Sequence, residues 1–304
     1  MDIILHHYDQ SPYSAKIRLI FGLKNLSWKS VIAPMVLPKP SLMPLTGGYR
    51  RTPVLQIGAD IYCDTLQIAS ELDRRFPEPP VLDASCHGLS SILGTWAERV
   101  LMWPTARYVT GANRGALPAS FFADRAAMRG HPLPTADAID AGLSHQRHQL
   151  RLMLDWIENL LADGRKFLVA ERPVLGDLAI YQRLWWLGAL GGKAADTLDP
   201  YPHTKAWMGR IAAAGHGKRT EMKPETALEV ARAAEPQPLP LGESDPDIRV
   251  GADVVVVTED FGTDPVRGSV LHATAERISI RRTNPVVGTI HVHFPRLGYE
   301  VKAI

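Results

Sequence analysis

The sequence predicts three consecutive units: an α/β domain, an all-α domain and a small all-β barrel. In the first eighty residues, short apolar runs and helical stripes follow one another in the order βαβ and then ββα. Between residues 89 and 214, apolar residues recur at helical spacing. After residue 250, short β-branched runs alternate with Gly and Pro, which is typical of a small barrel. We expect the three units at residues 1–80, 88–216 and 241–304.

The composition indicates a globular protein without a general affinity for nucleic acid or membranes. The chain has 304 residues, 45% of them hydrophobic, and a formal net charge of +2. Its two cysteines, Cys63 and Cys86, have no CxxC spacing and favour a reduced, cytoplasmic location. The N-terminus lacks the basic region and long apolar core of a signal peptide, and no run of about 18 uncharged apolar residues predicts a membrane span.

The first helix is predicted to start at a tight turn behind a buried strand. An apolar run at residues 3–8 precedes Ser11-Pro12-Tyr13-Ser14. Ser11 is a good N-cap, and proline suits the first helical position because no N–H is needed there. One apolar stripe follows at helical spacing, formed by Tyr13, Ile17, Ile20 and Phe21. A hydroxyl at the positive end of this helix could hold an anion such as a thiolate.

Two strands and a helix complete the predicted first domain after a second strand at 28–32 and a proline-rich loop. The runs 54–57 and 61–63 flank the turn Gly58-Ala59-Asp60 and predict a β-hairpin. Asp64-Thr65 then precedes an apolar stripe at i, i+4 and i+8, so one of these two residues is expected to cap the next helix.

Three elements of this segment resemble the thioredoxin-like domain of the glutathione transferase family. They are Ser11-Pro12-Tyr13-Ser14, Thr52-Pro53-Val54-Leu55 and Asp64-Thr65. The resemblance implies that the bond before Pro53 is cis and that Thr52 pairs its backbone with the cysteinyl unit of glutathione. It also implies that Asp64 and Thr65 hold the γ-glutamyl group. Arg51, Thr52, Pro53, Asp64 and Thr65 are therefore the expected glutathione-binding residues.

Two side chains compete as the hydroxyl that activates the thiol. Ser11 is favoured, because a hydroxyl donor at a helix N-terminus stabilises a thiolate. Tyr8 is the alternative donor, since some classes of the family use a tyrosine from the first strand region, and Tyr13 is expected in the core. With Ser11 and Ser14 where redox relatives carry cysteines, disulfide exchange through this motif is excluded.

The helical middle resembles the second domain of the same family. A long helix is expected at 89–109 with a kink at Pro104, and its Met102, Trp103 and Arg107 are expected to line an electrophile pocket. In a later helix, Asp177 stands where the family has the acidic half of a capping box. The serine or threonine of that box is missing, because Val174 occupies its position, and we expect a local cost of about 1 kcal/mol.

The tail beyond residue 240 has no counterpart in typical two-domain members. Its strands are expected at 252–257, 269–272, 277–281, 289–294 and 299–301. His291 and His293 face one side of a strand, but two ligands are a weak metal signal, so an ordinary polar face and no metal are expected. From residue 236 onward there are seven basic and nine acidic side chains, which argues against nucleic-acid binding.

These expectations favour a glutathione transferase-like enzyme. It would add an activated glutathione thiolate to a small, largely apolar electrophile, with glutathione as a substrate and no metal. The resemblance also implies a homodimer. The main alternative is a non-catalytic binding or assembly module that keeps the fold, because fold alone does not determine function.

Overall fold

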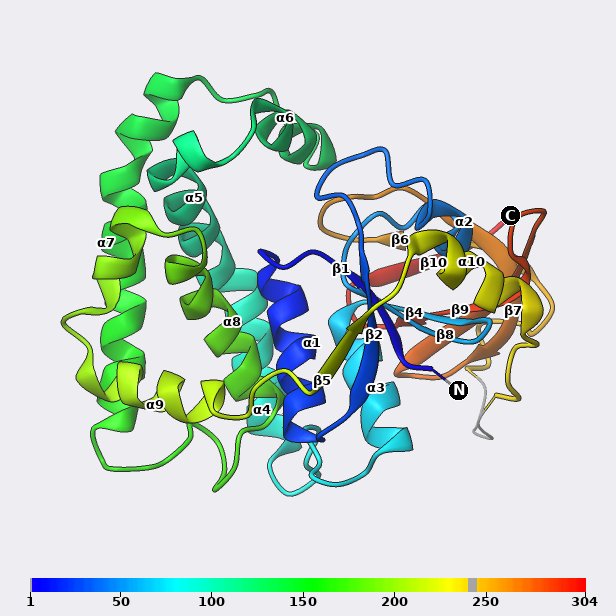
Figure 1. Cartoon of the computed structure of the whole chain (residues 1–304), viewed down its shortest axis with the longest axis horizontal. Helices are drawn as coiled ribbons and strands as arrows, with labels where there is room; N and C mark the ends of the chain where they lie inside the picture. The colour runs from blue at the N-terminus through cyan, green and yellow to red at the C-terminus, as the bar shows by residue number, and fades with distance from the viewer. Residues whose placement is uncertain (1, 240–244) are drawn as a thin grey trace.

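The computed structural model describes residues 2–239 and 245–304. It consists of one long mixed sheet with helices packed against it and a helical domain at one side (Figure 1). The predicted start of the third unit, residue 241, lies outside the described residues.

The first domain has the predicted order of elements. They are β1 (Ile4–His7), α1 (Pro12–Leu23), β2 (Ser27–Ile32), the short α2 (Met43–Thr46), β3 (Val54–Ile57), β4 (Asp60–Cys63) and α3 (Thr65–Arg75). β1 pairs in parallel with β2 and antiparallel with β3, which forms the expected hairpin with β4. The predicted cap is confirmed, since the Ser11 hydroxyl accepts the Ser14 amide at 3.2 Å and α1 begins at Pro12.

The second domain is helical, as predicted. It contains α4 (His87–Trp96), a π-helical turn (Ala97–Leu101), α5 (Met102–Ala112), a 3₁₀ turn (Arg114–Ala116), α6 (Ala119–Met128), α7 (Ala136–Leu161), α8 (Leu175–Ala189), a second 3₁₀ segment (Gly192–Leu198) and α9 (Pro202–Ala212). Within the part of the chain that is described, no helix is long and apolar enough to cross a membrane.

The irregularity in the long helix differs from the expected simple kink at Pro104. A π turn separates α4 from α5 and ends at Leu101, three residues before this proline. Proline has no N–H to donate and its ring crowds the preceding turn, so a widened turn there relieves the backbone. The π turn carries Glu98, which points back toward α1 and pairs with Lys16.

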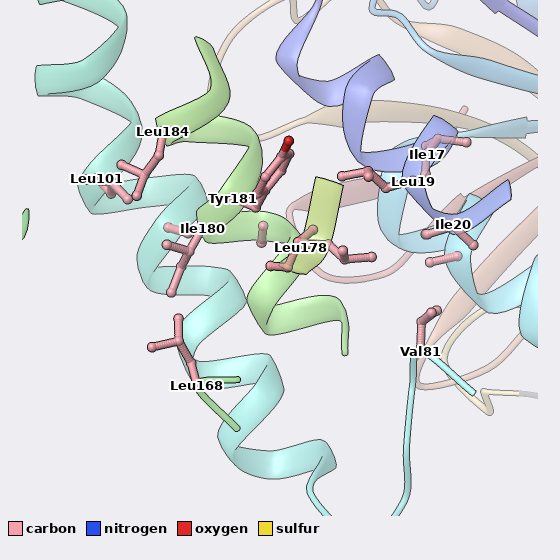
Figure 2. Packing of buried hydrophobic residues seen from close by; sticks show 14 of the residues in the cluster. Ile17, Leu19, Ile20, Val81, Leu101, Leu168, Leu178, Ile180, Tyr181 and Leu184 are labelled. Atoms are coloured by element: carbon pink, nitrogen blue, oxygen red, sulfur yellow. The ribbon is translucent and has the colours of Figure 1, made fainter. Parts of the chain in front are cut away.

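The two domains share one apolar core. Ile17 and Ile20 of α1 lie opposite Leu178 and Tyr181 of α8, with Leu101 beyond them (Figure 2). All five side chains are at most 6% exposed. The helical domain is therefore fixed against the helix that begins at Ser11.

The missing serine or threonine cap of α8 is replaced from another helix. Asp177 accepts the Val174 amide at 3.3 Å, which is the acidic half of the box. Valine has no acceptor, but the Ser90 hydroxyl of α4 accepts the free Gly176 amide at 2.9 Å. The expected cost of about 1 kcal/mol is thus offset by a contact that the local sequence does not reveal.

Two elements after the helical domain were absent from the sequence-based expectation. β5 (Lys218–Glu221) adds in parallel to β2, and α10 (Pro224–Ala233) follows it. All four residues of β5 are exposed, so the strand has no apolar alternation that could predict it.

All five strands expected in the tail are present, but they extend the first sheet instead of forming a separate barrel. They are β6 (Asp253–Thr258), β7 (Val266–Ala273), β8 (Arg277–Asn284), β9 (Gly288–Pro295) and β10 (Tyr299–Ala303). Among the described residues the strand order is β10-β6-β7-β8-β9-β4-β3-β1-β2-β5. β9 pairs in parallel with β4, so the edge that β10 would need for closure is taken by the first domain.

A buried polar network lies at the β4–β9 junction. Asp60 accepts from His293 at 3.0 Å, and the other ring nitrogen of His293 lies 2.8 Å from the Ser279 hydroxyl. Tyr62 stacks on the His293 ring with centroids 4.5 Å apart. His293 is only 2% exposed, so it belongs to this junction and not to the polar face expected for His291 and His293.

Candidate functional site

The three motifs of the first domain line one cavity of about 270 Å³ between the two domains. Its wall includes Pro12 at the start of α1, Thr52 and Pro53 before β3, and Asp64 and Thr65 at the start of α3. The Thr52–Pro53 peptide bond is cis, as the resemblance predicts. Sequence positions more than 50 residues apart thus meet at one site.

Ser11 lies at this end of α1 but outside the cavity wall. Its side chain is 1% exposed, and its Oγ accepts the Ser14 amide. Tyr8 and Tyr13 do line the cavity. The Tyr8 hydroxyl accepts from Arg125 at 3.4 Å. This placement gives both tyrosines more direct access to a bound molecule than Ser11 has.

The predicted core residue Tyr13 is better described as part of the cavity wall. The Arg183 guanidinium carbon lies 4.3 Å from the centroid of its ring. Burial raises the pKa of Tyr13, although the nearby charge of Arg183 opposes the rise. Its phenol is therefore protonated at neutral pH and can donate a hydrogen bond.

Asp64 combines a capping role with a special backbone conformation. Its Oδ1 accepts the Leu66 amide at 2.9 Å and caps α3. Its φ of 76° and ψ of 142° fall in a region that side chains rarely adopt, and such outliers concentrate at functional sites. Burial raises the pKa of Asp64, and the negative charge of Glu98 adds to the rise. A cation bound between the two carboxylates would relieve this repulsion.

Glu98 forms a partly buried ion-pair cluster at the same site. Its carboxylate pairs with Lys16 and accepts from Gln182 at 3.0 Å, while Arg183 lies 3.9 Å away. Burial alone would raise its pKa, but Lys16 and Arg183 hold the pKa of Glu98 below its ordinary value. It stays ionised next to Asp64 and adds negative charge to this end of the cavity.

The C-terminal strands contribute residues that sequence reasoning missed. The Tyr299 hydroxyl at the start of β10 lies 3.0 Å from Asp64 Oδ2 and 3.3 Å from the Tyr49 hydroxyl. A hydroxyl has one proton, and the carboxylate is the closer and stronger acceptor, so Tyr299 donates to Asp64 and accepts from Tyr49. No local motif marks Tyr299, because its partner is 235 positions away.

The expected glutathione-binding residue Arg51 is engaged by the same extension. Its guanidinium pairs with the Asp260 carboxylate, donates to the Phe261 carbonyl, and lies 4.1 Å from the centroid of the Phe261 ring. Arg51, Asp260 and Phe261 all line the cavity. The β6–β7 connection is therefore part of the site wall.

The expected electrophile pocket is divided between this cavity and an adjoining one of about 570 Å³. Met102 lines the first cavity, and Trp103 and Arg107 line the second. Residues from α6 and the β6–β7 connection, including Phe121 and Phe261, belong to both walls. The predicted residues therefore lie along one continuous surface.

The first cavity contains more basic than acidic side chains. Eight lysines and arginines line it, against four carboxylates, Asp64, Glu98, Asp124 and Asp260. Arg50 and Arg125 both pair with Asp124. Burial lowers the pKa of Lys39 to about 7, with Arg125 as the second cause. The cavity wall as a whole therefore has more positively than negatively charged groups.

Two family models match the chain. The model of the glutathione S-transferase N-terminal domain matches residues 5–80, and that of the C-terminal domain matches residues 136–214. A GST-like protein from Pseudomonas syringae has a solved structure with 32% sequence identity and a TM-score of 0.83. The similarity covers 100% of this chain and 99% of that chain, including the C-terminal strands.

Other solved structures are similar over a smaller share of this chain. A glutathione S-transferase from Rhodospirillum rubrum is 21% identical with a TM-score of 0.54, over 69% of this chain and 88% of that chain. FzlA from C. crescentus is also 21% identical with a TM-score of 0.54, over 75% of this chain and 92% of that chain. At this identity the likeness shows the fold alone. No curated protein sequence gave a significant match.

Proposed function

The chain belongs to the glutathione S-transferase family, and from this premise we propose that it transfers glutathione to a small, largely apolar electrophile. The observation that carries the proposal is the single cavity on which the α1 N-terminus, the cis Thr52–Pro53 bond and Asp64-Thr65 converge. An oxidised dithiol at the α1 turn has no part in it, because Ser11 and Ser14 cannot form one.

Each end of glutathione has a chemical partner in this arrangement. The γ-glutamyl ammonium pairs with the Asp64 carboxylate, close to the ionised Glu98, and the Thr65 hydroxyl donates to the adjacent carboxylate of the ligand. The Thr52 backbone, oriented by the cis bond, pairs with the cysteinyl unit. Arg51, which also lines the cavity, is the proposed partner of the remaining carboxylate. The thiol is thereby directed to the N-terminus of α1.

The reaction requires an ionised thiol. The thiol releases its proton to solvent, and the thiolate is stabilised by the positive end of α1. Ser11 is the proposed hydroxyl donor, since its Oγ accepts from Ser14 and its own proton has no acceptor among the described residues. Tyr8 and Tyr13, which line the cavity where Ser11 does not, are the alternative donors. The sulfur lone pair then forms the C–S bond at the electrophilic carbon. A leaving group, where there is one, departs with the bonding electrons.

The binding site is tested with Asp64→Asn and calorimetry of glutathione binding. Asparagine keeps an oxygen for the Leu66 amide, so the cap survives while the charge is lost. We expect affinity to fall about tenfold or more, because an ion-assisted bond to the ammonium is lost. Asp163→Asn, at a position 53% exposed, is the matched control and should bind normally. Equal affinity of Asp64→Asn and wild type would refute the assignment.

The donor is tested with Ser11→Ala, Tyr8→Phe and Tyr13→Phe. We expect Ser11→Ala to raise the pKa of bound glutathione, read from thiolate absorbance, and to slow conjugation roughly tenfold to a thousandfold. Loss of rate in Tyr8→Phe or Tyr13→Phe, with Ser11→Ala unaffected, would assign the role to that tyrosine. If glutathione binds but none of the three changes thiolate formation, the non-catalytic binding module is supported.

A homodimer is proposed as the assembled state. Large apolar side chains are exposed on two helices. On α7, Leu152, Trp156 and Leu160 recur every four residues and are 43, 55 and 42% exposed. On α4, Ile92 is 67% exposed. The Trp96 and Trp156 rings lie 6.2 Å apart and join the two helices into one apolar surface. A second copy, placed by a two-fold axis, can cover this apolar surface with its own.

The assembly is tested by light scattering at micromolar concentration. Wild type should give the mass of a dimer and Trp156→Glu that of a monomer. Val286→Glu changes a side chain that is 46% exposed in the extension and serves as the control. A wild-type monomer would exclude the dimer, and a dimeric Trp156→Glu variant would exclude this surface.

A further inference from the structure

Arginines and aromatic rings lie together where the two adjoining cavities share a wall. The Trp103 ring of α5 has two guanidinium carbons near its centroid, that of Arg107 at 5.6 Å and that of Arg129 at 5.0 Å. Phe261 meets Trp103 edge to face with centroids 6.1 Å apart. These four side chains come from α5, the end of α6 and the β6–β7 connection.

The positive charge of this group is uncompensated. Among the described residues, neither Arg107 nor Arg129 has a carboxylate within 4.0 Å, whereas Arg125 pairs with Asp124. The Nε of Arg129 is also buried without a hydrogen-bond partner. Burial, followed by the charges of Arg125 and Arg107, lowers the pKa of Arg129. Two like charges near one ring repel each other, and an anion bound between them would relieve this repulsion.

We propose that Trp103, Phe261, Arg107 and Arg129 form the subsite for a substrate with a planar aromatic body and an anionic group, such as an aromatic carboxylate. The ring packs on Trp103 and Phe261, and the carboxylate accepts from the two guanidinium groups, whose planar forks suit it. The subsite rests on the proposed function and narrows its electrophile to one with an apolar aromatic body and a single anionic group, but its binding chemistry does not require glutathione.

The β6–β7 connection of the C-terminal strands supplies one side of this subsite and is held there by several hydrogen bonds. The Phe261 carbonyl accepts from Arg51 and, at 3.0 Å, from the Thr258 hydroxyl. The Gly262 amide donates to the Met128 carbonyl of α6 at 2.8 Å. Gly262 has φ +63°, and a Cβ there would meet the Met128 side chain at 2.8 Å. The loop is thus fitted closely against α6, with Phe261 facing Trp103.

The test compares 1-naphthoate with its neutral analogue 1-naphthamide. Binding of each to the full chain is measured by calorimetry without glutathione. We expect 1-naphthoate to bind at least about tenfold more tightly than 1-naphthamide, and raised salt to weaken 1-naphthoate alone. Arg129→Gln and Arg107→Gln should each reduce this preference severalfold. Arg232→Gln, on the exposed side of α10, makes the same change of charge elsewhere and should leave it intact.

Phe261→Ala separates the aromatic contact from the charge. It should weaken both naphthyl compounds to a similar degree and preserve their ratio. Glutathione binding is measured separately on every variant. Failure of glutathione to bind would overturn the proposed function, while an arginine-dependent preference for 1-naphthoate would still support the subsite. Equal affinity for both compounds, or a preference unchanged in Arg129→Gln and Arg107→Gln, would overturn the subsite.

Discussion

Tyr299→Phe tests whether the C-terminal sheet acts on the glutathione site through Asp64. The tyrosine is 6% exposed and its hydroxyl donates to Asp64 Oδ2 at 3.0 Å. A hydrogen bond to a charged group contributes about 1.5–3 kcal/mol. Its loss leaves the charged form of Asp64 less stabilised, so the pKa of Asp64, already raised by burial, rises further.

The consequence for glutathione depends on pH and has a definite sign. The ligand ammonium needs the carboxylate form, so affinity falls as pH drops through the pKa of Asp64. In Tyr299→Phe this fall should begin at higher pH, and on the acidic side affinity should be about tenfold to a hundredfold lower. Above this pH range, Tyr299→Phe should bind glutathione as tightly as wild type or slightly more tightly. In the variant the Tyr299 hydroxyl no longer competes with the ligand ammonium for the Asp64 carboxylate.

The assay is calorimetry of glutathione binding from pH 4 to pH 8. Tyr201→Phe is the matched control, since its hydroxyl bonds to the Arg151 carbonyl in the helical domain at 3.3 Å. General damage from the substitution would weaken binding at every pH. Superimposable pH profiles of Tyr299→Phe and wild type would refute the coupling.

Two further predictions concern stability. Burial lowers the pKa of His6 to about 4 and that of His7 to about 3, with Arg18 as the second cause for His7. Both lie below the unfolded value of 6.5, so stability is full above pH 6.5 and is lost as pH falls toward 4. At pH 5 the two histidines together should lower the free energy of unfolding by about 4 kcal/mol relative to its value at high pH. Urea unfolding measures this change, and a free energy of unfolding that stays constant from pH 7 to pH 5 would contradict the prediction. Asp177→Ala should lower the free energy of unfolding by about 3 to 5 kcal/mol. The substitution removes the acceptor of three hydrogen bonds, from the Leu168 amide at 2.8 Å, the Trp207 indole N–H at 3.1 Å and the Val174 amide at 3.3 Å. Asp177→Asn keeps one oxygen and should lose less, and an equal loss in both variants would argue against the hydrogen bonds as the cause.

The local parts of the structure were predictable because short-range chemistry determines them. The Ser11 cap, the β3–β4 hairpin and the five strands of the tail all follow from residues within a few positions of one another. The cis bond before Pro53 came from the family resemblance, since proline alone permits but does not require it.

What could not be predicted depends on contacts between distant positions. β5 forms because it pairs with β2, although its four residues have no strand pattern. Ser90 replaces the missing cap of α8 from 86 positions away. Asp260 and Phe261 carry no motif, and they reach Arg51 only because the extension folds onto the first domain.

The parallel pairing of β9 with β4 explains why the extension reaches the site at all. Parallel strands have their carboxyl ends at the same edge of a sheet, so the segments that follow β4 and β9 emerge together. Asp64 directly follows β4, and Tyr299 comes four residues after β9. A shift of one residue would turn every β9 side chain to the other face, but the bond from His293 to Asp60 holds the register. The buried junction therefore determines the position of Tyr299, and the third unit is a structural part of the proposed glutathione site.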